Sequence, residues 1–340
     1  MADVTPDRIM QMGLGFMASK TILLAVKLGV FTQLDDKSMS GTELGKVLDI
    51  HSRSLYDFLD ALVVLGFLAR DGIKETSDYR NTPESQAFLV QGKPSYIGGI
   101  FEMCNDRLFN SWGNLDESLR TGKPQTVVDE NGETVFDTLY SSPEGLKQFL
   151  QAMGGAQLGN FIALSKKFDF SSYKTLCDVG GAGGDLCIQL ALNVPHLSLT
   201  THDLPAVAPI AQENIKGAGV DDRIQVASGD FFKDALPKAD VITMGNILHD
   251  WGLEEKRTLF RKAFEALPEG GAFIAIENVI DNDRSKNVFG LLMSLNMLVE
   301  TGDGFDYAFN DFEGWAKEAG FRKTELIPLA GPTSAAVAYK

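Results

Sequence analysis

Hydrophobic and polar positions follow one period in the first 100 residues of the chain and another after residue 174. In the first part, apolar residues recur at the spacing of one face of a helix. Residues 13–31 form the most apolar stretch, and Lys20 and Lys27 interrupt it. We therefore predict a buried amphipathic helix there, and neither a membrane span nor a secretory signal.

Two shorter helices and a hairpin are expected next. One helix opens within residues 39–43 with Thr42 as its cap, and a second begins at Ser52 and ends at Gly66, a residue typical of helix C-termini. Residues 67–73 and 79–83 have the pattern of paired strands. This order of helices and hairpin outlines a winged helix. Residues 85–165 are mostly helical and are rich in Phe, Met and Gly.

After Lys174 the pattern changes to strands that alternate with helices. The strands are expected at residues 175–179, 197–202, 224–228, 241–246 and 272–279, with a final pair at 322–328 and 334–339. Such alternation predicts a doubly wound, Rossmann-like α/β domain, with a parallel sheet covered by helices on both faces. Sheets of this kind bind ligands beyond the carboxyl ends of their strands, so the residues there are the candidates for function.

Charge narrows the possible partners. The 340 residues include 31 Lys and Arg against 46 Asp and Glu, a net charge of −15, which repels phosphate backbones. The second helix of the winged-helix outline carries Arg53 beside Asp57 and Asp60, so we predict a packing or dimerisation module and no nucleic-acid or membrane partner. Three Cys without metal-binding spacing favour a reducing compartment, and we predict a cytoplasmic protein without a metal site.

A glycine-rich loop follows the first strand of the α/β pattern. Residues 178–184 read Asp-Val-Gly-Gly-Ala-Gly-Gly, which allows a tight turn with backbone N–H groups close to a ligand. The glycine spacing fits neither the dinucleotide fingerprint nor a P-loop. The acid before the glycines, Asp178, suits a ligand with a positively charged amino group.

Two more acids end the next two strands. Asp203 ends the second strand, where a carboxylate can accept both hydroxyls of a ribose. Asp230 lies beside Phe231 after the third strand, a pair suited to the amino group and the ring face of an adenine. Each acid alone could be a cap or a turn residue, but three at successive strand ends indicate one ligand with three parts.

Together these motifs resemble a known family. The loop at 178–184, Asp-Leu-Pro at 203–205, Gly-Asp-Phe-Phe at 229–232 and Ile-Leu-His-Asp-Trp at 247–251 are similar to the motif series of S-adenosylmethionine-dependent small-molecule O-methyltransferases, the plant caffeate-like and bacterial antibiotic-tailoring enzymes. The resemblance covers nearly the whole chain. It implies a winged-helix-like dimerisation domain over residues 1–100, a helical linker that contributes to the acceptor pocket over 101–165, and a methyltransferase domain over 166–340.

The resemblance also implies a cofactor, S-adenosylmethionine, a product, S-adenosylhomocysteine, a small-molecule acceptor and a homodimer formed through the N-terminal domain. The residues that it places at the cofactor are Asp178, Gly180, Gly181, Gly183, Asp203, Leu204, Gly229, Asp230, Phe231 and Asn246.

His249 lies where the family has its general base, and Glu277 and Asp306 lie where it has the acids that orient this histidine. Imidazole is the side chain whose ordinary pKa suits proton transfer near neutrality, although a lone histidine could also be structural. Asp250 is expected to be a structural or helix-starting acid. We expect the acceptor pocket to be lined by Phe136, Phe149, Met153, Met293, Asn296 and Met297, with ordinary core packing as the alternative for each.

Three positions depart from the family pattern. Gly245 lies where many plant members carry Lys, Ser294 replaces a frequent Asp, and residues 306–307 read Asp-Tyr in place of Glu-Arg. These changes leave the acceptor open. Methylation of a hydroxyl is the main hypothesis, with S- or C-methylation, a cofactor-binding protein without methyltransferase activity and a DNA-binding regulator as the alternatives.

Overall fold

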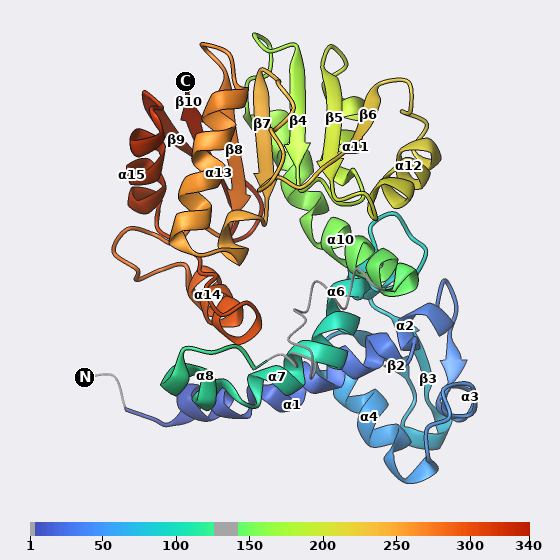
Figure 1. Ribbon diagram of the computed structural model, residues 1–340. Helices are drawn as coiled ribbons and strands as arrows, with labels where there is room; N and C mark the ends of the chain where they lie inside the picture. The colour runs from blue at the N-terminus through green and yellow to red at the C-terminus, as the bar shows by residue number, and fades with distance from the viewer. Residues whose placement is uncertain (1–3, 126–141) are drawn as a thin grey trace. The chain divides into compact units, whose positions relative to one another are not determined.

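The computed structural model describes residues 4–125 and 142–340 and divides the chain into two compact units, Met1–Asn110 and Ser111–Lys340 (Figure 1). Each unit is described by itself below. The three-part division predicted from the sequence stays a prediction.

The first unit is mostly helical and carries a small antiparallel sheet with strand order β1-β3-β2. The predicted hairpin is confirmed, because β2 pairs with β3. The second predicted helix, α4, begins at Ser52 as expected, and Gly66 follows it with a φ of +85°. The elements are α1 (Asp7–Lys27), α2 (Val30–Gln33), β1 (Met39–Ser40), α3 (Gly41–Val47), α4 (Ser52–Val64), β2 (Leu68–Asp71), η1 (Lys74–Thr76), β3 (Asp78–Asn81), α5 (Pro83–Phe88), α6 (Gly98–Met103), the π-helix η2 (Cys104–Leu108) and α7 (Phe109–Trp112), which spans the division.

The cap predicted for α3 is wrong by two residues. Ser40, not Thr42, caps the helix: its hydroxyl accepts the N–H of Glu43, and the Glu43 carboxylate accepts the N–H of Ser40. This reciprocal capping box fixes the start of the helix at Gly41.

The prediction of a buried amphipathic helix over residues 13–31 is wrong for most of α1. Leu14 and Met17 are 45% and 50% exposed, whereas Val26 is 4% exposed. Only the C-terminal part of the helix contributes to the core of the first unit, so its N-terminal half presents apolar side chains to the surface. In the described part of the chain, α1 alone is long and apolar enough to cross a membrane by length and composition, a test that signal sequences and core helices also pass.

The second unit contains a seven-stranded sheet, and its seven strands are those that the alternation predicts. Their order in the sheet is β6-β5-β4-β7-β8-β10-β9. The strands are parallel except β10, which runs antiparallel to β8 and β9. They are β4 (Thr175–Val179), β5 (Ser198–Asp203), β6 (Ile224–Ser228), β7 (Val241–Gly245), β8 (Ala272–Glu277), β9 (Lys323–Pro328) and β10 (Ser334–Tyr339). The chain leaves β4 on one side toward β5 and later returns on the other side to β7, so a ligand crevice is expected between β4 and β7.

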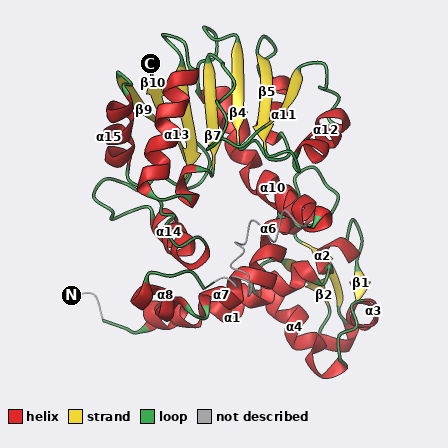
Figure 2. Cartoon of the chain, viewed as in Figure 1, coloured by secondary structure: helices red, strands yellow, loops and turns green. Residues whose placement is uncertain are grey.

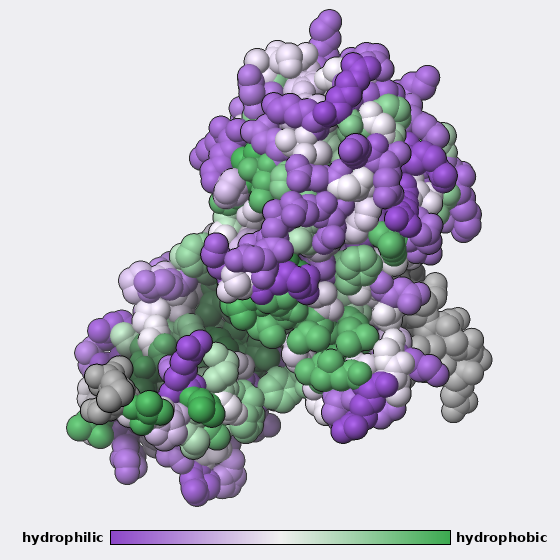
Figure 3. All heavy atoms as spheres, turned by 90° about the vertical axis from the view of Figure 1, so that its left-hand side faces the viewer, coloured by the Kyte–Doolittle hydropathy of each residue, from purple (hydrophilic) through white to green (hydrophobic). Residues whose placement is uncertain are grey.

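Helices cover both faces of this sheet (Figure 1, Figure 2). One buried core includes residues of α10, α11 and α12, and the other includes residues of α13 and α15, so the sheet is doubly wound as predicted. The helices are α8 (Leu115–Thr121), α10 (Pro143–Lys167), α11 (Asp185–Asn193), α12 (Ala208–Gly217), η3 (Leu248–Asp250), α13 (Leu253–Ala266), α14 (Val288–Glu300) and α15 (Phe309–Ala319). In the view of Figure 3, the surface over this sheet is mostly hydrophilic, in keeping with the many charged residues of the chain.

Candidate active site

The glycine loop between β4 and α11 leaves no room for side chains. Gly180 and Gly184 have φ values of +70° and +82°, a region that favours glycine. A Cβ on Gly181 would lie 2.2 Å from the Thr201 hydroxyl oxygen, and one on Gly183 would lie 2.7 Å from the amide nitrogen of Asn214. The loop therefore forms a backbone cradle beside the start of α11 and contains three of the four glycines predicted at the cofactor, Gly180, Gly181 and Gly183.

Acidic side chains surround this cradle. The Asp178 carboxylate is buried and accepts the Thr243 hydroxyl at 2.7 Å, and burial with the neighbouring charges of Asp203 and Asp185 raises its pKa to about 7. The Asp203 carboxylate accepts the N–H groups of Ala182 at 2.8 Å and Leu204 at 2.7 Å, and burial raises its pKa too. Asp178 is buried and its neighbours Asp185 and Asp203 are half-buried, so three adjacent carboxyl groups are costly to ionise together and a positively charged ligand would be favoured here.

The loop after β6 brings an acid and an aromatic ring to the same edge of the sheet. Phe231 lies close to the cradle, since a Cβ on Gly180 would come within 4.0 Å of its ring. The Asp230 carboxylate accepts the N–H of Phe232 at 2.9 Å and pairs with the Lys233 ammonium at 2.8 Å. Gly229 has no room for a side chain, because a Cβ there would lie 2.8 Å from His202.

Asn246 follows β7 in a left-handed backbone conformation, with a φ of +52°. Its side-chain oxygen is buried, and in residues 4–125 and 142–340 it has no hydrogen-bond partner; the same holds for the Thr201 hydroxyl. Asn246 directly follows β7, so a polar ligand bound at this strand end could satisfy its side-chain oxygen, whereas the Thr201 hydroxyl lies within β5 against Gly181. The residues present fit the cofactor that the sequence motifs imply.

His249 lies in the short helix η3 after β7 and is 6% exposed. A carboxylate faces each ring nitrogen: Asp306 lies 3.5 Å from Nδ1, and Asp250 lies 3.5 Å from Nε2. Glu277, at the end of β8, accepts the backbone N–H of His249 at 3.2 Å and does not bond the ring. The structure thus brings all three predicted catalytic residues together, but Glu277 holds the backbone of the histidine.

The acids control the protonation of His249. Burial disfavours the imidazolium, but Asp250, Asp306 and Glu277 outweigh burial and raise the pKa of His249 to about 10. Burial in turn raises the pKa of Asp250 to about 7, although His249 opposes that change. Before any ligand arrives, the imidazole therefore holds a proton at neutral pH.

Three residues of this cluster were not among the predicted site residues. Asp250 is expected from the sequence to be structural or helix-starting, but α13 begins at Leu253 and the Asp250 carboxylate faces the imidazole. Tyr307 is 1% exposed, and Lys256 is fully buried. The sequence does contain a signal for Lys256, because it lies on the apolar face of α13 with Leu259, Phe260 and Ala263.

Five of the six residues predicted to line the acceptor pocket lie on two helices, α10 and α14. Phe149 on α10 packs in a small cluster with Ala182 of the glycine loop, and Met153 lies one turn further along α10. On α14, Met293 is half-buried, and Asn296 and Met297 are buried, with the Asn296 side-chain oxygen accepting the Trp112 indole N–H at 2.8 Å. Phe136 lies outside the described residues.

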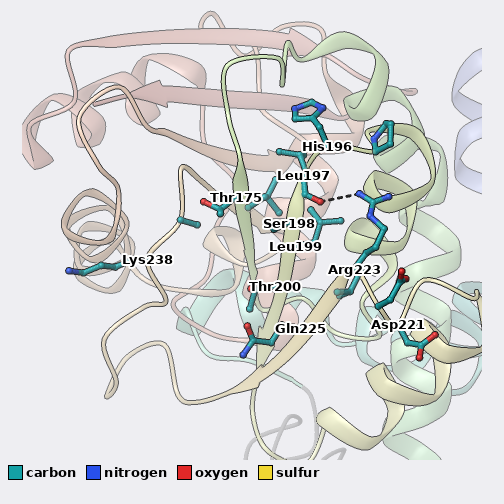
Figure 4. A pocket seen from close by; sticks show the side chains of 15 residues that line it. Thr175, His196, Leu197, Ser198, Leu199, Thr200, Asp221, Arg223, Gln225 and Lys238 are labelled. Atoms are coloured by element: carbon teal, nitrogen blue, oxygen red, sulfur yellow. Dashed lines mark hydrogen bonds between the residues drawn. The ribbon is translucent and has the colours of Figure 1, made fainter.

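A groove of about 690 Å³ lies at the opposite edge of the sheet, along the first residues of β4, β5 and β6 (Figure 4). Thr175, Ser198 and Arg223 line it, and the Arg223 guanidinium donates to the carbonyls of Leu197 and Ala191. This groove contains none of the predicted site residues, and its arginine is engaged in holding the backbone, so we place the site at the carboxyl ends of the strands.

Comparison with known proteins identifies two domains. Residues 112–322 match the O-methyltransferase domain, and residues 10–91 match the O-methyltransferase dimerisation domain. The chain is 38% identical over 335 residues to the tetracenomycin polyketide synthesis 8-O-methyl transferase TcmO of Streptomyces glaucescens, covering 98% of this chain and 97% of that protein. It is 33% identical over 314 residues to the N,N-dimethyltransferase OxyT of Streptomyces rimosus, covering 92% and 90%.

A solved structure agrees in fold over the full length. Human N-acetylserotonin methyltransferase in complex with S-adenosylmethionine aligns with a TM-score of 0.90 and 27% identity, covering 100% of this chain and 99% of that one.

Proposed function

This chain belongs to the S-adenosylmethionine-dependent O-methyltransferase family, and we propose that His249 is the general base of its reaction, oriented by Glu277 and Asp306. The chain is a methyltransferase that uses S-adenosylmethionine and acts on a small molecule. The proposal concerns which residues do the chemistry and which acceptor they serve.

The cofactor would be held at the glycine loop. When bound, it supplies a methyl group already activated on a sulfonium. In this proposal, Asp203 accepts the ribose hydroxyls, and Asp230 and Phe231 contact the adenine. Asp178 and the glycine backbone face the amino-acid part, and the unpaired oxygen of Asn246 can accept from it. These assignments rest on the strand ends from which each side chain projects.

The observation that carries the proposed base is the buried imidazole with a carboxylate 3.5 Å from each ring nitrogen. Such a group accepts the proton of an acceptor hydroxyl, because the carboxylates stabilise the imidazolium that forms. The imidazole can accept a proton only when it is neutral, so its pKa of about 10 must fall when the site is filled. A positively charged cofactor held at the glycine loop would lower it, since a nearby cation disfavours the imidazolium. Glu277 and Asp306 are positioning residues that fix the backbone and the ring.

We propose a hydroxylated aromatic molecule as the acceptor. Phe149 beside the glycine loop and Met293 and Met297 on α14 offer apolar contact, which suits a planar ring system, and methionine adapts to irregular shapes. The similarity to an O-methyltransferase of polyketide synthesis favours the same class of acceptor, a hydroxylated aromatic molecule. The similarity to an N,N-dimethyltransferase makes an amine acceptor a second candidate beside thiols and carbon.

Labelled S-adenosylmethionine with a panel of polycyclic phenols, arylamines and thiols tests this proposal. We expect methyl transfer to a phenol, and His249→Asn is expected to lower kcat by about 10²–10⁴-fold, the usual contribution of a general base. Asp306→Asn should lower it less. Wild-type rates in His249→Asn would exclude the general-base role, and transfer to thiols or amines alone would overturn the acceptor class.

We also propose a homodimer formed through the N-terminal domain. The match to a dimerisation domain supports it, and the exposed apolar half of α1 supplies a surface that a second copy would cover. Phe16→Asp, on α1, should give a monomer in light scattering. Ile73→Asp, which changes another exposed apolar residue, in the hairpin, should leave a dimer. A dimer that survives Phe16→Asp and similar changes along α1 would exclude this surface.

The cytoplasmic location stays a prediction.

A further inference from the structure

A buried lysine lies behind the candidate active site. The Lys256 side chain on α13 is 0% exposed, and its ammonium donates to the Trp251 carbonyl at 2.5 Å. The same nitrogen lies 3.4 Å from the ring centre of Phe305 and 6.0 Å from that of Tyr307. In the part of the chain that the structure describes, no carboxylate comes within salt-bridge distance of it. Burying a charged group is costly unless it is paired and hydrogen-bonded, and Lys256 has one hydrogen bond and an aromatic ring as its contacts.

Lys256 contacts two segments of the active site: the one that carries His249 and the one that carries Asp306. Trp251 continues the segment of His249 and Asp250, and Phe305 and Tyr307 flank Asp306. These segments already pack backbone to backbone, because a Cβ on Gly304 would lie 2.6 Å from the His249 carbonyl oxygen. The lysine therefore links the segment that carries the base to the segment that carries its carboxylate.

Charge in the same region favours a cation at this place. The acids whose charge acts on Lys256 are Glu277 at the end of β8, Asp306 after α14, Asp250 in η3 and Glu255 on its own helix. Glu300 on α14 adds a charge that acts on Asp250. Burial lowers the pKa of Lys256 to about 8, while these acids oppose that change, so the ammonium is charged at neutral pH.

We propose that Lys256 is a positioning residue for methyl transfer, which links the segments of His249 and Asp306 and places a positive charge beside the carboxyl groups around the imidazole. The inference rests on the proposed role of His249. Without this charge, the pKa of Glu277 and that of His249 both rise, because a nearby cation favours the carboxylate and disfavours the imidazolium. Both changes require a higher pH for activity.

Two variants distinguish the role of the Lys256 hydrogen bond from the role of its positive charge. Lys256→Gln keeps a donor for the Trp251 carbonyl but has no charge, and Lys256→Met has neither. Lys340→Met is the matched control, because the Lys340 ammonium also donates to backbone carbonyls, of Phe264 and Leu267, and lies 4.2 Å from an aromatic ring centre.

The measurement is kcat/KM against pH with a polycyclic phenol as acceptor and S-adenosylmethionine at saturation. We expect the acidic limb of the kcat/KM profile to move to a higher pH by about one unit in Lys256→Gln, which is the lower end of the effect of a nearby charge. At a pH below the limb, kcat/KM should therefore fall about tenfold. The KM for S-adenosylmethionine should change less than twofold. Lys256→Met should show the same shift and a lower plateau, and Lys340→Met should follow the wild type.

A second measurement needs no acceptor. The imidazole resonances of the four histidines are followed against pH with sinefungin, a charged analogue of the cofactor, bound to each variant. The midpoint of His249 should rise by about one unit in Lys256→Gln. If neither the limb nor this midpoint moves in Lys256→Gln, the inference is wrong. If His249→Asn keeps wild-type activity, the proposed base fails, whatever the Lys256 variants do.

Discussion

The charge state of His249 can be tested by removing the two carboxylates that face its ring. In the cofactor-free protein, the pKa of His249 is raised from 6.5 to about 10, and at about 1.4 kcal/mol per pH unit the imidazolium gains roughly 5 kcal/mol over its state in the unfolded chain. Burial alone would lower the pKa, so the acids must supply more than this net amount. Asp250→Asn with Asp306→Asn removes two of the three acids and should lower the pKa by at least about 2 units, with each single variant in between.

The assay is an NMR titration of the histidine side chains, with the His249 signal identified by its loss in His249→Asn. Asp303→Asn is the control, because this exposed acid lies in the same loop as Asp306. A wild-type midpoint near 6.5, or an unchanged midpoint in the double variant, would refute the reasoning. Because folding raises the pKa of His249, this residue also makes the free energy of unfolding depend on pH. Its stabilising contribution is complete below pH 6.5 and is lost as the pH rises toward 10.

Three further predictions concern the cofactor site and the first unit. Asp203→Asn should weaken S-adenosylmethionine binding about tenfold or more by calorimetry, since a charge-assisted hydrogen bond contributes about 1.5–3 kcal/mol; unchanged affinity would remove Asp203 from the site. Gly181→Ala should abolish that binding because its Cβ would lie 2.2 Å from the Thr201 hydroxyl oxygen, whereas Gly217→Ala, with open space around it, should bind normally. Ser40→Ala should lower the free energy of unfolding of the first unit by about 1 kcal/mol in a urea titration, and Thr42→Ala should not; the opposite order would contradict the observed cap.

The sequence was most informative where the pattern is local. Strands β4, β6 and β10 have the bounds that the sequence predicts, because each reads as a short run of strand-forming residues between turns. The glycine loop and the acids at the strand ends could also be placed, since the topology of a parallel sheet brings its strand ends to one edge.

The sequence was less informative where the partner of a residue is distant. Apolar spacing cannot tell whether α1 packs against its own unit or remains exposed, so the burial predicted for its N-terminal half was wrong. Spacing likewise cannot show that Glu277 bonds the backbone of His249 rather than its ring, or that Lys256 reaches across to Phe305. These contacts depend on the tertiary packing of segments far apart in the chain.

The place of β10 inside the sheet has a consequence for the order of folding. β10 comes after every other strand in the chain, yet it lies between β8 and β9, and its Ser334 pairs with Glu277. Until the β9–β10 hairpin docks, the edge of β8 is open to pairing with other chains, and Glu277 is not held in place. We therefore expect the active site to be among the last parts of the unit to form. Pulsed hydrogen exchange during refolding should protect β4 and β5 before β8, and simultaneous protection of all the strands would contradict this order.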